Sequence, residues 1–211
     1  MKSHWRQLAA LLPLSLEKTI YSRYFKHADI EWQAVGKKSP PSHLVKQMQI
    51  RSLANKYRIN VLVETGTYLG DMVFAMQDSF EKIYSIELSP FYYQKAKQRF
   101  RKYNHINILE GDSGQILSAL VPELKQPSLF WLDGHYSGGK TAMGEKECPV
   151  FEELKSIFSS TLNHIIAIDD ARLFIGQNDY PTIDELHAFV NKITLGKDIS
   201  IQNDAIIITP K

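Results

Sequence analysis

The sequence predicts an α/β protein in which a mainly parallel sheet is covered by helices on both faces. From Asn60 onward, short apolar runs alternate with longer stretches of helical periodicity, which is typical of repeated strand–helix units. The chain then ends in two strand-like runs joined by Asn203-Asp204, a pattern that predicts an antiparallel hairpin. Five parallel strands followed by a hairpin differ from a symmetric dinucleotide-binding fold, which continues with a second βαβ half.

Short apolar runs define the five parallel strands, which we expect at Val61–Glu64, Ile83–Glu87, Ile106–Glu110, Leu129–Leu132 and Ile165–Ile168. Helical segments follow the strands and begin near residues that favour a cap or a first turn. They are Asp71–Phe80, Pro90–Tyr103, Ser113–Val121, Pro149–Ser159 and Thr182–Lys192. The hairpin strands are expected at Ile199–Gln202 and Ala205–Thr209.

Residues 1–58 are expected to form an amino-terminal helical cap on the domain formed by residues 59–211, the two making one structural unit. The chain is helical in pattern up to about Lys38, and Ser39-Pro40-Pro41-Ser42 breaks it before a further helix at His43–Tyr57. The apolar run Leu8–Leu16 is short and is interrupted by Pro13, so it is neither a leader peptide nor a membrane span. We expect an amphipathic first helix that packs on the domain or on a second subunit of a homodimer.

Composition excludes several classes of protein. With 211 residues, 44% of them hydrophobic, the chain is long enough to bury one substantial core. Lys and Arg number 25 against 23 Asp and Glu, so the charge predicts a small-molecule partner rather than nucleic acid. A single cysteine, Cys148, allows no internal disulfide, which fits a reducing, cytoplasmic location without membrane association.

In an open α/β sheet, ligands bind beyond the carboxyl ends of the strands, and these positions are acidic here. The first strand ends at Glu64 and is followed by a loop in which Gly66 and Gly70 permit a tight turn and close approach to a ligand. Glu64 is placed to hold a cationic amine or a loop amide. The second strand ends at Glu87, about twenty residues later, where a carboxylate can accept hydrogen bonds from ribose hydroxyls. The alternative role for Glu87 is a solvated cap before Ser89-Pro90.

The third strand leads into Gly111-Asp112-Ser113, where Asp112 can accept from an adenine amino group, cap the next helix, or do both. Together with Glu64-Thr65-Gly66-Thr67-Tyr68-Leu69-Gly70 and Ser85-Ile86-Glu87-Leu88, this succession resembles the first three motifs of class I S-adenosylmethionine-dependent methyltransferases. The resemblance covers about Asn60 to Lys211, and it implies a Rossmann-like methyltransferase sheet. A third glycine that is usual in the family is replaced by Thr67 or Tyr68.

The resemblance also implies the cofactor, S-adenosylmethionine, and the residues that contact it. These are Glu64, Gly66, Thr67, Tyr68, Gly70, Glu87, Asp112, Ser113 and Asp133.

Strands four and five end in Asp133 and in Asp169-Asp170, so three carboxylates should converge without an equal number of cations. Oxygen ligands without sulfur indicate Mg²⁺ or a similar divalent ion. The pattern resembles metal-dependent O-methyltransferases of the catechol and macrolide-sugar types, which implies Asp133, Asp169 and Asp170 as metal ligands. The alternative is that Asp170 pairs with Arg172, Asp169 accepts backbone amides, and Asp133 alone takes part in the chemistry.

The segment Gly134–Cys148 is too long and polar for a simple connection and is expected to form part of the acceptor pocket. His135 and Lys140 are the candidate bases and His135 is preferred, with Asp133 as the third catalytic candidate. A metal would lower the pKa of a bound acceptor hydroxyl, which would then attack the sulfonium methyl group.

The sequence therefore predicts transfer of a methyl group from S-adenosylmethionine to a hydroxyl of a small molecule, assisted by a divalent metal. A metal-independent methyltransferase acting on nitrogen or oxygen is the second possibility. A nucleoside-binding protein without turnover is a third, because fold alone does not determine activity. A nicotinamide-dependent oxidoreductase is a fourth, disfavoured by the terminal hairpin and by the missing Gly-x-Gly spacing.

Overall fold

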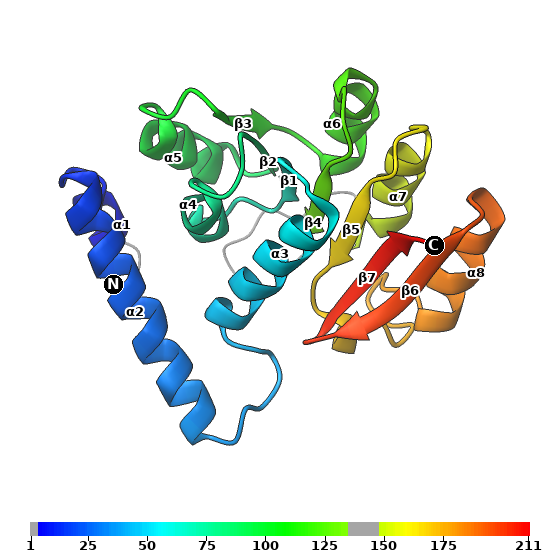
Figure 1. The fold of residues 1–211 in the computed structure, drawn as a ribbon, viewed down its shortest axis with the longest axis horizontal. Helices are drawn as coiled ribbons and strands as arrows, with labels where there is room; N and C mark the ends of the chain where they lie inside the picture. Colours follow the sequence, from blue (N-terminus) through cyan, green and yellow to red (C-terminus); the bar gives the residue numbers. More distant parts are fainter. Residues whose placement is uncertain (1–3, 135–147) are drawn as a thin grey trace.

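The computed structural model describes residues 4–134 and 148–211, and its centre is a seven-stranded sheet with strand order β3-β2-β1-β4-β5-β7-β6 (Figure 1). β1 to β5 are parallel, whereas β7 runs antiparallel to both of its neighbours, β5 and β6. The strands are β1 (Val61–Thr65), β2 (Lys82–Glu87), β3 (Ile106–Glu110), β4 (Leu129–Leu132), β5 (Ile165–Ile168), β6 (Lys197–Gln202) and β7 (Ala205–Pro210). The predicted fold class, five parallel strands followed by a hairpin, is confirmed.

The helices between the strands lie where the sequence predicts them, with small differences at their ends. They are α4 (Asp71–Met76), α5 (Pro90–Phe100), α6 (Ser113–Leu120), α7 (Val150–Phe158) and α8 (Ile183–Ile193), with short 3-10 turns η1 (Val121–Glu123) and η2 (Ala171–Leu173). The largest difference is in α4, which ends at Met76 rather than at Phe80. There the amide of Ser79 donates to the Met76 carbonyl at 2.8 Å, which turns the chain toward β2.

Both faces of the central strands β1, β4 and β5 are buried, since successive residues point to opposite sides and all of them are covered. Leu62, Trp131 and Ala167 face a core that also contains side chains of α2 to α5. Val63 and Phe130 face a second core, formed with α6, α7 and α8. Burial on both faces explains why the parallel strands are apolar runs without alternation.

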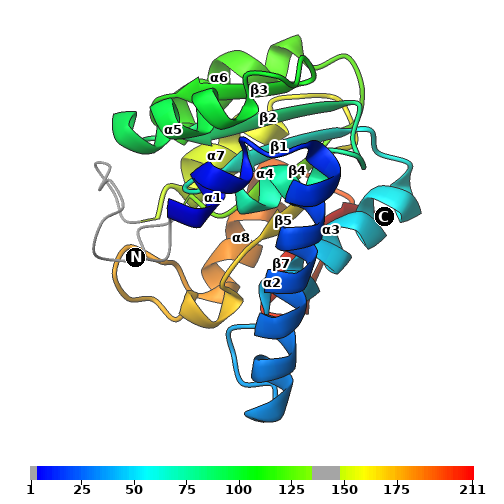
Figure 2. The same cartoon turned by 90° about the vertical axis from the view of Figure 1, so that its left-hand side faces the viewer.

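Three helices, α1 (His4–Ala9), α2 (Leu14–Ala34) and α3 (His43–Tyr57), precede the sheet in the segment that the sequence assigns to the amino-terminal cap. The chain breaks before Pro13 and separates α1 from α2, so the apolar run Leu8–Leu16 is divided between them. The carboxyl-terminal half of α2 extends beyond the body of the molecule in both views (Figures 1 and 2). Within the described ranges, the helices are too short or too polar to cross a membrane.

The cap is packed onto the sheet domain through an aromatic contact. The Tyr21 side chain of α2 is 4% exposed, and its ring centroid lies 4.2 Å from that of Phe74 in α4. The Tyr21 hydroxyl accepts a hydrogen bond from Arg99 of α5. Tyr21 therefore shares a core with the sheet rather than with the cap alone.

Tyr21→Ala should lower the free energy of unfolding by about 3 kcal/mol or more, the usual cost of removing a buried aromatic side chain. The matched control is Tyr24→Ala, whose side chain is 40% exposed and should cost clearly less. Urea unfolding followed by circular dichroism measures both. Equal losses in the two variants would show that the cap does not depend on the Tyr21 contact.

Candidate functional site

The register of the parallel strands brings the predicted site residues to one edge of the sheet. Thr65 of β1 pairs with Ile86 of β2 and with Leu132 of β4, and Leu132 pairs in turn with Ile168 of β5. The residues that follow these strands are therefore neighbours in space. The acidic strand ends read from the sequence therefore lie along one edge of the sheet.

The loop after β1 is tight because Gly66 lies against the end of β4. Its backbone has φ of +85°, and a Cβ atom placed on it would lie 2.3 Å from the carbonyl oxygen of Asp133. The Gly66 amide also donates to the Ile86 carbonyl at 2.9 Å. The contact with the Asp133 backbone already requires glycine at this position, and a close approach of Gly66 to a ligand stays a prediction. Gly70 is similar, since its Cβ would lie 2.6 Å from Phe100.

Glu87 holds this loop from the end of β2. One carboxylate oxygen accepts from the Tyr68 amide at 2.6 Å, and the other accepts from the Ser89 amide at 2.8 Å. Burial raises the pKa of Glu87, and the two backbone hydrogen bonds oppose the shift. Glu87 thus caps the start of α5, as the alternative interpretation required, but it is buried rather than solvated. Each oxygen keeps capacity for a further donor such as a ribose hydroxyl.

Glu64 is the most deeply buried acid of the loop region. Its carboxylate accepts from the Ser85 hydroxyl, and the Ser85 oxygen is 2.6 Å from that of Thr67. Burial raises the pKa of Glu64 to about 8, while the Ser85 hydrogen bond opposes the shift. The hydrogen bond of Glu64 therefore goes to a neighbouring strand and not to a loop amide. Thr67 points into the same buried chain of hydroxyls rather than toward the edge.

Asp112 follows β3 and caps α6, with one carboxylate oxygen accepting from the Gln115 amide at 3.1 Å. Its capping role is confirmed, and the other oxygen remains as an acceptor. Ser113, the first residue of α6, lies near Glu153 of α7, which the sequence interpretation missed. Burial raises the pKa of Glu153 to about 7, with the hydroxyls of Ser113 and Thr65 opposing the shift. No local motif marks Glu153, because an acid in the first turn of a helix, as in α7, is common without any role in a site.

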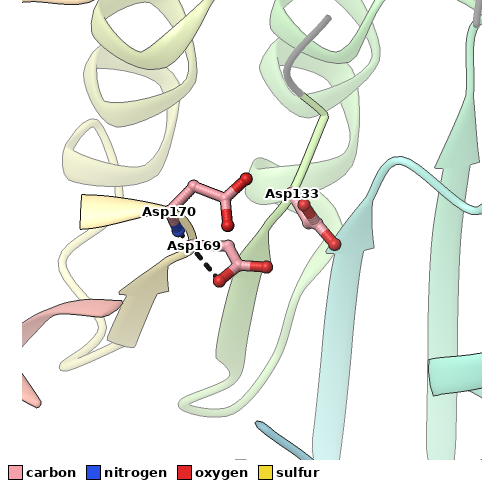
Figure 3. Close-up of side chains that lie close together, drawn as sticks. All are labelled: Asp133, Asp169 and Asp170. Carbon is pink, nitrogen blue, oxygen red and sulfur yellow. Dashed lines mark hydrogen bonds between the residues drawn. The ribbon is translucent and has the colours of Figure 1, made fainter. Parts of the chain in front are cut away.

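Asp133, Asp169 and Asp170 form the carboxylate cluster that the sequence predicts (Figure 3). Each offers an oxygen within 4.8 Å of the others. Asp169 is 0% exposed, and one of its oxygens accepts from the Asp170 amide at 2.8 Å. Burial and then the neighbouring Asp169 raise the pKa of Asp133; burial likewise raises the pKa of Asp169. Water therefore does little to stabilise a negative charge on the buried Asp169.

Among the described residues, two cations enter this cluster of three carboxylates. The Lys46 ammonium of α3 binds the second oxygen of Asp169 and lies 3.5 Å from Asp170. Arg172 donates to Asp170 at 2.8 Å and also binds Asp204 in the hairpin turn. The Asp170–Arg172 pair and the backbone bond to Asp169 are the arrangement that the alternative interpretation described. Lys46 was not foreseen, because it comes from a helix 123 residues earlier in the chain.

The predicted bases His135 and Lys140 lie outside the described residues, as does the rest of the segment 135–147. Their roles stay predictions.

The sequence matches no family model and no curated protein. The fold, in contrast, matches solved methyltransferases. The O-methyltransferase TomG from Streptomyces achromogenes, in complex with S-adenosylmethionine, has a TM-score of 0.60 at 12% identity over 88% of each chain. A Bacillus cereus O-methyltransferase with S-adenosylhomocysteine has a TM-score of 0.59 at 11% identity, covering 88% of this chain and 90% of that one. The Podospora anserina methyltransferase PaMTH1, bound to S-adenosylhomocysteine, has a TM-score of 0.55 at 16% identity, covering 86% of this chain and 85% of that one. These matches confirm the predicted class I methyltransferase fold.

Glu64→Gln should change how stability depends on pH. Wild-type Glu64 keeps its proton up to a pKa of about 8, whereas the unfolded chain releases it near the ordinary glutamate pKa of 4.5. The wild type therefore loses stability as pH rises through this window, and Gln cannot. As the pH rises from 5 to 8, the free energy of unfolding of the variant should increase by on the order of 2–4 kcal/mol relative to that of the wild type. Unfolding curves at each pH measure this. Exposed Glu123→Gln is the control, and parallel curves for Glu64→Gln would contradict the burial argument.

Proposed function

We propose that this protein transfers the methyl group of S-adenosylmethionine to a hydroxyl of a small acceptor. The observation that supports this most is the arrangement of Glu87, Asp112 and the loop Gly66–Gly70 at adjacent strand ends. A carboxylate after β2, an acceptor after β3 and a tight loop after β1 form a set that suits ribose, adenine and the amino-acid part of the cofactor. Neighbours of the same fold bind this cofactor or its product.

The described residues fit the cofactor by their chemistry. Glu87 retains lone pairs that can accept from both ribose hydroxyls, and its position is held by the Tyr68 and Ser89 amides. Asp112 can accept from the adenine amino group with the oxygen that does not cap α6. When bound, S-adenosylmethionine supplies a methyl group on a positively charged sulfur. Asp133, next to Gly66, stands at the junction between this cofactor region and the carboxylate cluster.

The acceptor hydroxyl must lose a proton as it attacks the methyl group. We place it in front of Asp133, between the cofactor loop and the cluster, and keep His135 and Lys140 as the candidate bases. Orientation is the main contribution expected from the protein, since both reactants are held at one sheet edge.

A divalent cation such as Mg²⁺ is part of this proposal. Three carboxylate oxygens within 4.8 Å of one another are a hard donor set of the kind that magnesium prefers. The Lys46 ammonium binds Asp169 and lies near Asp170, so these carboxylates already stabilise a positive charge. Bound there, the ion would lower the pKa of an acceptor hydroxyl.

The Lys46–Asp169 ion pair supports a second candidate, methyl transfer without a metal. A lysine that is 15% exposed and bonded to a fully buried aspartate already supplies a cation to the cluster. Lys46 and Arg172 would then supply the positive charge for Asp169 and Asp170, with Arg172 shared by Asp204, and Asp133 would face the acceptor. The two candidates differ in whether an added ion stabilises the folded protein.

Glu87→Gln should weaken binding of S-adenosylhomocysteine by on the order of 1–3 kcal/mol, because the charged hydrogen bonds to ribose are lost. Isothermal titration calorimetry measures the affinity, and thermal unfolding checks that the loop contacts of Glu87 have not collapsed. Glu110→Gln is the matched control, because Glu110 is the register partner of Glu87 on β3 but is exposed. Unchanged affinity in a folded Glu87→Gln protein would refute the assignment.

Mg²⁺ should raise the thermal unfolding temperature of the wild type, and chelator should reverse this, because only the folded chain assembles the three carboxylates. Lys46→Met should show a larger Mg²⁺ shift, since the competing ammonium is gone. Without metal the same variant should lose about 3 kcal/mol, because Asp169 stays buried without its partner. Exposed Lys56→Met on the same helix is the control. If Mg²⁺ changes the unfolding temperature of neither the wild type nor Lys46→Met, and methyl transfer proceeds in the presence of chelator, the metal-independent candidate is supported.

A further inference from the structure

A second cavity lies away from the carboxylate cluster, between α1 and α5. Its volume is about 360 Å³, a size that suits a small organic ligand. Five of its lining residues are cationic and none is acidic: Arg6, Lys95, Arg99, Arg101 and Lys102. The cavity touches the loop after β1 at Leu69. Arg99 also donates to the Leu69 carbonyl of that loop, and the ion pairs described above for the carboxylate cluster use Lys46 and Arg172 instead of these cations.

Two of these cations meet at one carboxylate. Arg6 and Arg99 both lie close to Asp71, at 2.6 and 3.5 Å. Lys102 lies 3.3 Å from Glu17. Positive side chains are therefore concentrated at the inner wall of the cavity. An anion would be attracted to this wall.

Lys95 and Arg101 are the cations that a ligand can recruit. Among the described residues neither makes an ion pair, and Lys95 only lies over the Phe91 ring, 4.1 Å from its centroid. Cations near the carboxyl end of α5 are stabilised by the helix dipole. That effect does not explain Arg6, which comes from α1 and adds to the same charge.

The other lining residues are the polar Gln98 and the apolar Ala10, Leu11, Leu69 and Ala96. Leu11 is 79% exposed, so its side chain is available to cover an apolar group. A lining that combines cations with apolar side chains is complementary to a molecule that carries both a negative charge and hydrocarbon. Inorganic anions would not use the apolar part of this lining.

We propose that the cavity between α1 and α5 is a second ligand site, for a small anion with an apolar group, such as a phosphate or carboxylate on a short chain. Arg6 and Arg99 provide fixed positive charge, and Lys95 and Arg101 contact the anionic head. Leu11 and Leu69 contact the apolar part. The site does not depend on the proposed methyl transfer.

Calorimetric titration of the full chain with octyl phosphate, below the concentration at which it forms micelles, tests the proposal. Octyl phosphate should bind with a dissociation constant below about 1 mM, and inorganic phosphate and 1-octanol should each bind at least about tenfold more weakly. Equal affinity for 1-octanol would overturn the role of the cations. Equal affinity for inorganic phosphate would overturn the role of the apolar wall.

The double variant Lys95→Met/Arg101→Met locates the site. It should bind octyl phosphate at least about tenfold more weakly while its unfolding temperature stays near that of wild type. Lys125→Met/Lys192→Met removes two exposed lysines elsewhere and should bind normally. Unchanged binding in the Lys95/Arg101 variant would overturn the proposal. Displacement of octyl phosphate by saturating S-adenosylhomocysteine would also overturn it, because the two sites are separate.

Co-sedimentation with phosphatidylglycerol vesicles distinguishes a free ligand from a lipid headgroup. If the ligand is a free molecule, the protein should bind octyl phosphate and should not bind the vesicles. Vesicle binding that is lost in Lys95→Met/Arg101→Met would support the same site and assign its anion to a lipid. Vesicle binding without octyl phosphate binding would overturn the cavity as the site.

Discussion

The site depends on one electrostatic constraint, which is that carboxylates on neighbouring parallel strands end at the same edge of the sheet. Asp133 and Asp169 follow strands in register, and Asp170 comes next, so their charges meet around the buried carboxylate of Asp169. Such a group is costly unless cations join it. Lys46 from α3 and Arg172 from η2 meet this requirement, whether or not a metal ion also binds.

The same constraint explains why the amino-terminal cap belongs to the site. Glu64 and Asp169 continue the strand faces of Leu62 and Ala167, which pack in the core shared with α2 to α5. Lys46 therefore reaches the cluster from the helix above it. A comparable pair, Arg6 with Asp71, ties α1 to the start of α4. Cap and sheet are thus connected by buried charge as well as by aromatic packing.

The loop after β1 connects structural requirements with the proposed chemistry. Gly66 is held against the Asp133 backbone and Tyr68 is held by Glu87, so a change at any of these positions shifts the others. The candidate cofactor and metal regions consequently share Asp133 as a common wall. A substitution in the loop should therefore affect both regions, and it should be judged by stability as well as by binding.

The sequence by itself determined the order of strands and helices, the terminal hairpin, and the strand ends where Glu87, Asp112 and Asp133 lie. These follow from local periodicity and from the geometry of parallel sheets, which act over a few residues. Only the tertiary structure decided which charges neutralise the cluster and why Gly66 must be glycine. Lys46 meets Asp169 across 123 residues, and Gly66 meets the backbone of Asp133. Such contacts arise from the packing of distant segments, and no local pattern encodes them.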